Sequence, residues 1–137
     1  MSVSRFLEAQ RWSYEDALRE IRAGRKESHW IWFIFPQLKG LGQSYTAEKY
    51  GIRDLDEAAE YLSDPTLKAR LTEISEALLA LPGSDPRAVM DNPDDLKLRS
   101  SMTLFAAAAP DIPVFQQVLD KYYHGQPDPK TLALLKE

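Results

Sequence analysis

A stripe of aliphatic residues at helical spacing, between residues 64 and 83, constrains the fold more than any other feature. Its members recur every three or four positions over four turns: Leu67, Leu71, Ile74, Leu78 and Leu81. Asp64-Pro65 before the stripe is typical of an N-cap followed by a proline in the first turn, and Pro82-Gly83 ends the pattern. We therefore predict a long helix here, whose apolar face has to be buried against other elements.

Six further segments carry helical signals and begin near residues 14, 28, 54, 92, 114 and 128. Ser13 is a candidate N-cap for the first of them, with Asp16 three residues on in a capping-box pattern. Asn92-Pro93 and Asp128-Pro129 repeat the arrangement of a cap followed by proline. These signals predict a chain in which helix follows helix.

The apolar run from Ser28 to Phe35 is ambiguous, because periodicity does not distinguish a short buried strand from a buried helix. We favour a helix with Ser28 as its N-cap and Pro36 as its end. No second strand-like segment is present to pair with it, and a lone strand leaves its backbone groups without partners.

Length and composition bound the remaining choices. A chain of 137 residues fits one domain, and residues 1–137 are predicted to form a compact all-α orthogonal helical bundle of about six to seven helices. The net charge of −4 argues against nucleic-acid binding. There is no cysteine and no apolar run long enough for a membrane span, so we expect a soluble cytoplasmic protein without a metal site, a cofactor or a membrane partner.

A first group of candidate functional residues precedes and enters the aromatic run. Arg25 and Lys26 stand beside a predicted helix N-terminus, where free N–H groups and the helix dipole favour an anion. They also follow the end of the previous helix, where cations can simply offset its dipole. His29 is either an acid–base candidate or a core histidine held by a carbonyl group. Trp32 and Gln37 complete this group as candidate ligand contacts.

The loop at residues 38–44 contains Gly40, Gly42 and Ser44, which would let the backbone approach a ligand closely. A G-x-G pattern without a preceding strand is not a dinucleotide fingerprint. A plain flexible loop therefore remains the competing interpretation, with Ser44 kept as a candidate ligand contact.

A second group lies on the segment that follows Asn92-Pro93. Asp94, Lys97 and Ser101 are spaced to share one face of a helix that is otherwise apolar nearly all round. A carboxylate, an ammonium and a hydroxyl at the end of a buried stripe are costly unless they are paired or used. The structural alternative is an ion pair of Asp94 with Lys97, with Ser101 bonded back to its own helix.

The segments GRKESHWIWFIFPQLKGLGQS and DDLKLRSSMTLF together resemble the bacterial family known as domain of unknown function eighteen-ten. The resemblance covers nearly the whole chain and implies an all-helical single domain with no established activity or catalytic residues. Some members are labelled calpastatin, but this sequence has none of the repetitive, disordered character that the label implies. The resemblance implies a Phe-Gly pair shortly before the second segment in many relatives, and this chain departs from that pattern with Met90-Asp91.

These observations favour a site for a small anionic ligand between the helices of His29 and Asp94. Arg25, Lys26 and Lys97 would hold the anionic group, either His29 or Asp94 would exchange a proton, and Ser101 would orient the ligand. A nucleotide or an ADP-ribose derivative is the concrete candidate, in part by analogy with other small helical proteins that process ADP-ribose. Hydrolysis, the oligomeric state and the reaction type are left open.

Two other interpretations compete with the ligand site. In one, the chain is a non-enzymatic protein-interaction module whose aromatic surface patch is supplied by the aromatic run and by Tyr45, Tyr50 and Tyr61. In the other, both motifs are purely architectural.

Overall fold

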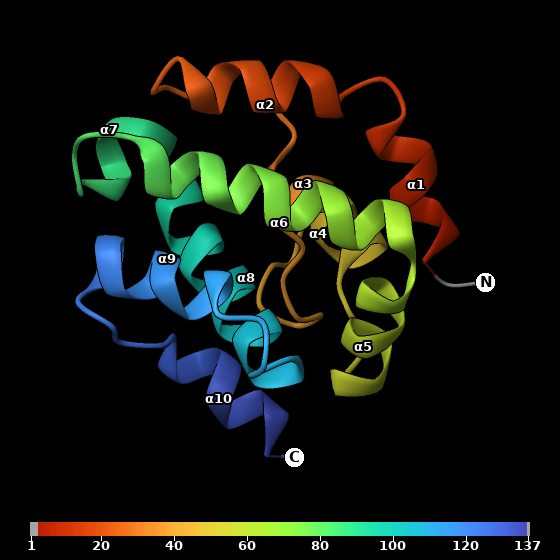
Figure 1. The fold of residues 1–137 in the computed structure, drawn as a ribbon. Coiled ribbons are helices and arrows are strands. Elements are labelled where there is room, and N and C mark those ends of the chain that lie inside the picture. The colour runs from red at the N-terminus through yellow and green to blue at the C-terminus, as the bar shows by residue number, and fades with distance from the viewer. Residues whose placement is uncertain (1–2, 137) are drawn as a thin grey trace.

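The chain folds into a succession of helices joined by short connections (Figure 1), in a computed structural model that describes residues 3–136. Ten helices lie within this range. They are α1 (Ser4–Gln10), α2 (Tyr14–Arg22), α3 (Ile31–Ile34), α4 (Tyr45–Tyr50), α5 (Leu55–Ser63), α6 (Pro65–Ala80), α7 (Pro86–Met90), α8 (Asp94–Ala108), α9 (Val114–Tyr123) and α10 (Pro129–Leu135).

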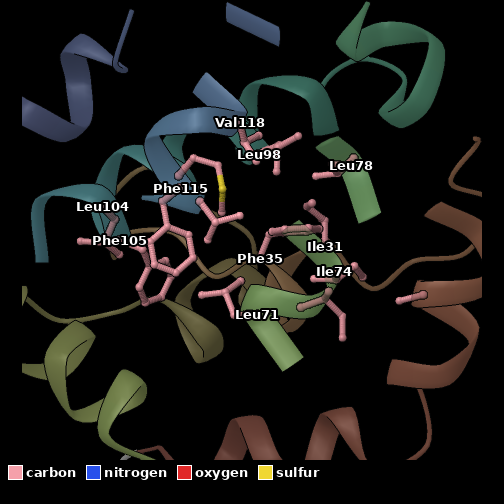
Figure 2. Packing of buried hydrophobic residues seen from close by; sticks show 14 of the residues in the cluster. Ile31, Phe35, Leu71, Ile74, Leu78, Leu98, Leu104, Phe105, Phe115 and Val118 are labelled. Carbon is pink, nitrogen blue, oxygen red and sulfur yellow. The ribbon is translucent and has the colours of Figure 1, made fainter. Parts of the chain in front are cut away.

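Two long helices, α6 and α8, organise the packing. Figure 1 shows α6 running across the molecule, and it contacts α2, α5 and α9. Helix α8 contacts α5, α7, α9 and α10. Their side chains meet those of the shorter helices in one apolar core, part of which is drawn in Figure 2. Because α10 lies on α8, the C-terminal segment is placed next to the first turns of α8.

The predicted stripe of α6 is confirmed as a core face. Leu67, Leu71, Ile74 and Leu78 are each at most 1% exposed, and burying such a side chain contributes roughly 1.5–3 kcal/mol. The Asp64 carboxylate accepts hydrogen bonds from the backbone N–H groups of the first turn, as the cap-and-proline pattern predicts. Leu81 is the exception, since it lies beyond the last turn and is only partly buried.

Helix α8 is buried nearly all round, as expected, but it begins later than predicted. Its first residue is Asp94, Pro93 takes the N-cap position, and no side chain caps the helix. The Asn92 side chain donates instead to Asp95 Oδ1 at 3.1 Å. The prediction that Asn92 caps this helix was therefore wrong.

The aromatic run is helical, but only over the four residues of α3. Ser28 is not its N-cap, because the Ser28 hydroxyl donates to the Glu20 carboxylate on α2. After α3 the chain extends, and Leu38 forms an isolated parallel bridge with Ile52. This bridge fixes the direction of the segment that leads away from α3.

The all-α prediction is confirmed, and residues 3–136 contain no strand beyond that bridge. The seven predicted helices are all present, and α1, α4 and α7 are additional short ones. The capping box predicted at Ser13 is not formed, because Asp16 pairs with Arg19 and the Ser13 side chain caps nothing. In the part of the chain that is described, no helix is long and apolar enough to cross a membrane.

Candidate functional site

A buried carboxylate organises the segment that leads from α2 to α3. Glu20 is only 6% exposed, and its oxygens accept from the backbone N–H groups of Glu27 and Ser28, from the Ser28 hydroxyl and from Trp30 Nε1, at 2.6–2.9 Å. Burial raises the pKa of this carboxyl, but the hydrogen bonds outweigh it and bring the pKa down to about 2. Glu20 thereby holds residues 27–30 in one conformation.

The same segment is tied to α8 by an ion pair that the sequence did not predict. Lys26 Nζ lies 2.8 Å from Asp94 Oδ2, and the Lys26 side chain is only 7% exposed. This ammonium also donates to the Ser28 carbonyl at 2.5 Å and lies 5.0 Å from the centre of the Trp30 ring. Lys26 is therefore largely committed to structure and has little capacity left for a ligand.

Lys97 is held more loosely. Its Nζ is 3.5 Å from Asp94 Oδ1 and 5.2 Å from the centre of the Trp32 ring. The predicted pair of Asp94 with Lys97 exists, but it is the longer of the two ion pairs of Asp94. Because Lys26 already neutralises this carboxylate, the charge of Lys97 is only partly compensated.

Lys97 lines an open hollow of about 470 Å³ between residues 37–42, the start of α8 and the start of α10. We call it the Gln37 hollow. Its lining combines an apolar wall with polar groups: Gln37, Leu41, Gly42, Pro93, Leu96, Lys97, Ser100, Asp128, Pro129 and Lys130. Volumes of this size are typical of small-molecule sites.

The side-chain amide of Gln37 is the most unusual group in the hollow. Gln37 is only 8% exposed, yet its amide has no hydrogen-bond partner among residues 3–136. Its backbone carbonyl is used, since it accepts from Ile52 N–H at 2.9 Å. Its amide atoms are not among the buried polar atoms without a partner, so they keep contact with solvent at the hollow.

Gly42 keeps the wall beside Gln37 close. A Cβ at this position would lie 2.6 Å from Ala47 Cβ and 3.3 Å from Gln37 Nε2. The glycine is thus required for the loop to pack on α4 and against the Gln37 amide. At this position the loop is therefore packed, and the interpretation of residues 38–44 as a plain flexible loop stays a prediction.

Ser101 is a second buried group without a partner. Its hydroxyl is completely buried and makes no hydrogen bond with the described residues. The predicted bond back to its own helix is made instead by Ser100, which donates to the Leu96 carbonyl at 3.1 Å. Ser101 follows Lys97 by one turn, so it lies deeper along the helix face that begins with Asp94 and Lys97.

Of the nine predicted site residues, Gln37 and Lys97 line the Gln37 hollow, and the other seven do not: Arg25, Lys26, His29, Trp32, Ser44, Asp94 and Ser101. His29 and Arg25 are exposed on the segment before α3. Ser44 is the N-cap of α4, and its hydroxyl accepts from Ala47 N–H at 3.1 Å. The structure therefore brings together Gln37, Lys97 and, through the Lys26–Asp94 pair, the edge of the aromatic run.

The sequence did not predict that the start of α10 would line the Gln37 hollow. Asp128 and Lys130 line it, while Asp128 also caps α10 and accepts from the Ser100 hydroxyl at 3.2 Å. The Asp128-Pro129 pair predicted a helix start, but not that this helix would dock against α8. That docking depends on contacts between segments far apart in sequence, such as Arg99 Nε donating to the Gln126 carbonyl.

Fold and hollow together define a small all-helical domain with one amide-bearing hollow, and the described residues contain no group of three or more side chains suited to a metal ion. The chain belongs to the family described as Protein of unknown function (DUF1810), whose model matches residues 1–135. It is similar to the crystal structure of the conserved hypothetical protein Rv1873 from Mycobacterium tuberculosis, with 46% sequence identity and a TM-score of 0.96. The match covers 98% of this chain and 96% of that one. No curated protein matches the chain.

Proposed function

We propose that this protein binds a small anionic molecule in the Gln37 hollow. The observation that carries the proposal is Gln37, which is 8% exposed as a residue, lines the hollow and has a side-chain amide without a partner among the described residues. The donors and the acceptor of this amide are therefore open to a ligand in the hollow, which would replace water as their hydrogen-bond partner.

The lining favours a ligand with a charged end and a less polar body. Lys97 and Lys130 supply positive charge, while Asp128 is engaged by Ser100 and by its own helix. Leu41 and Leu96 offer apolar surface on which a flat ring can lie. The Gln37 amide can donate and accept at once, as the edge of a nucleobase requires.

A nucleotide or an ADP-ribose derivative combines these features, and we propose this class as the ligand. The proposal covers binding and not hydrolysis. Both carboxylate oxygens of Asp94 are already near ammonium groups, and His29 does not line the hollow. Neither group is therefore a strong acid–base candidate.

The competing interaction patch has little support. Of its three tyrosines, Tyr61 is completely buried and Tyr50 is packed against the core, which leaves Tyr45 at 81% exposure. Trp12 is 80% exposed, but nothing links it to Tyr45. We therefore advance no second function.

The proposal is tested by thermal unfolding with adenosine monophosphate, ADP-ribose and inorganic phosphate as separate probes. A ligand that binds only the native state at about 100 times its Kd stabilises it by about 2.7 kcal/mol. We expect at least one adenosine-containing probe to raise the Tm, and Gln37→Ala and Lys97→Met to reduce that shift. Gln43→Ala, which changes an exposed glutamine of the same loop, is the matched control.

Gln37→Ala has a second use as a stability measurement. Because its amide has no partner to lose, we expect the substitution to leave the free protein nearly as stable as wild type, apart from the lost aliphatic packing. The absence of a Tm shift with all three probes, or a shift that is equal in wild type and Gln37→Ala, would contradict the proposed site.

A further inference from the structure

A second, smaller hollow includes residues that are neighbours in sequence of those that line the Gln37 hollow. Its volume is about 140 Å³, and it is formed by the segment after α2 and by α7. Its lining is Arg25, Lys26, Arg87, Ala88, Val89 and Asp91. Pro93, only two residues beyond Asp91, belongs to the Gln37 hollow, so the short 91–93 connection contributes to both.

Backbone hydrogen bonds hold this second hollow in shape. Lys26 N–H donates to the Val89 carbonyl at 2.7 Å, which fixes the segment after α2 onto α7. Arg25 N–H donates to the Glu20 carbonyl at 3.1 Å, and the Glu20 carboxylate anchors the residues that follow. The main chain that carries the two cations is therefore positioned independently of any ligand.

Two guanidinium groups of this hollow are available. The Arg25 side chain makes no ion pair, hydrogen bond or ring contact with the residues that the structure describes. Arg87 Nε is 3.6 Å from Asp95 Oδ2, which is beyond a normal hydrogen bond, and its side chain is 68% exposed. Planar guanidinium groups bind oxyanions through paired N–H donors.

The balance of cations and carboxylates around the second hollow decides whether it can bind an anion. Lys26 is matched by Asp94, so its charge is already neutralised. Asp91 is the acidic residue of the lining, and its Oδ1 accepts from Asn92 N–H at 2.9 Å, which directs part of this carboxylate to the backbone. With Asp95 as the partner of Arg87, two carboxylates face two arginines, and Arg25 is the one whose side chain has no partner among the described residues.

We propose that this hollow is an anion site of its own, which holds one phosphate-sized oxyanion between Arg25 and Arg87. The sequence predicts Arg25 and Lys97 in one site. In the structure Arg25 lines the second hollow, and Lys97 lines the Gln37 hollow. The proposal does not rest on the proposed function. The structural alternative is that both arginines only offset the negative C-terminal ends of α2 and α7.

The test is a titration of the ¹⁵N-labelled protein with inorganic phosphate, followed by NMR, against sodium chloride of equal ionic strength. We expect saturable shifts of the amide signals of Arg25, Lys26 and Ala88 with phosphate and not with chloride. Arg25→Gln and Arg87→Gln should each weaken binding about tenfold, the effect of losing one charged hydrogen bond.

Two control variants separate this site from other sources of binding. Arg11→Gln removes an exposed arginine that stacks on Trp12, and Lys97→Met removes the cation of the Gln37 hollow. Both should leave the phosphate affinity at residues 25–26 unchanged. Shifts that do not saturate, that are equal in Arg25→Gln, or that disappear in Lys97→Met would overturn the proposal.

Discussion

The α6 side of the core and the first turns of α8 differ in how many of their polar groups have hydrogen-bond or ion-pair partners. We call the α6 side the matched region, because its polar groups have such partners and its apolar side chains are buried. On α6 the aliphatic side chains are buried, Asp64 caps the first turn, and Lys121 Nζ donates to three carbonyls at the C-terminal end. At the start of α8 no side chain caps the helix, Asp91 has a positive φ, and Gln37 and Ser101 have no partners among the described residues.

This difference is the one expected between a region that only stabilises a domain and a region that binds a ligand. Groups that only stabilise a fold are selected for complete matching, whereas binding sites retain polar groups and backbone conformations that cost stability. Asp91 and Gln37 line the two hollows beside the 91–93 connection, whereas Ser101 is buried further along α8. The four predictions below test whether the two regions really differ in this way.

The largest effects are expected in the matched region. Leu71→Ala and Ile74→Ala should each lower the free energy of unfolding by roughly 2–5 kcal/mol, since both side chains are at most 1% exposed and each substitution leaves a cavity. Figure 2 shows both residues among the buried side chains of the core. Urea denaturation of each variant measures the loss. Losses below about 0.5 kcal/mol would mean that α6 is not packed as described.

Helices with strong local signals could be predicted from the sequence, and weaker ones could not. The α6 stripe and its cap were recognised because spacing and capping act within one helix. Helix α7 was missed although Asp85-Pro86 repeats the pattern of Asp64-Pro65, because its five residues are too few to show an apolar period. Helix α1 was missed because it has no capping side chain and no acidic first turn.

The next largest effect is the loss of folding stability that we expect when acid protonates Glu20. Hydrogen bonds hold its pKa near 2, below the ordinary value of 4.5, so the folded state favours the charged carboxylate. The resulting stability is present above about pH 4.5 and is lost as the pH falls toward 2. It amounts to about 3 kcal/mol.

Glu20→Gln isolates this contribution. The amide oxygen can still accept from Trp30 Nε1, and the amide nitrogen can donate to the Ser28 hydroxyl, so the local geometry is retained while the charge is removed. The stability curve of the variant should be flatter than that of wild type between pH 5 and 2 by about 3 kcal/mol. Parallel curves measured by urea denaturation at each pH would contradict the assigned pKa.

The candidate site was only partly predictable. The resemblance and the spacing of Asp94 and Lys97 located the correct end of α8, because both signals lie within one helix. The close partner of Asp94 was not predicted, since Lys26 reaches it from a segment about 70 residues away. Which side chains are left without partners, Gln37 above all, follows only from tertiary packing.

Asp91→Gly should produce a smaller change of opposite sign. Asp91 has φ 65° and ψ 165°, a region that only glycine adopts without strain. Glycine would relieve the strain but lose the hydrogen bond of Asp91 Oδ1 to Asn92 N–H, so we expect a gain of about 0.5–1 kcal/mol. Thermal unfolding would show it, and a lower Tm than wild type would refute it.

The smallest effect is expected for Lys97→Met. If Lys97 were the sole partner of Asp94, its removal would leave a carboxylate unpaired at a cost of roughly 3–5 kcal/mol. Lys26 lies closer to that carboxylate, at 2.8 Å against 3.5 Å, and its side chain is far less exposed, so Asp94 stays paired in the variant. We therefore expect a change of less than about 0.5 kcal/mol in the free protein, within the range of surface substitutions.

Lys26→Met is the matched comparison, because it removes the other ammonium from the same carboxylate. It should cost several times more than Lys97→Met, since the Ser28 carbonyl and Asp94 both lose their closest donor. Denaturation of both variants in one buffer measures the difference. If Lys97→Met proved as destabilising as Lys26→Met, Lys97 would belong to the matched part of the molecule. Its place in the Gln37 hollow would then be structural, and the distinction between the two regions would not extend to this lysine.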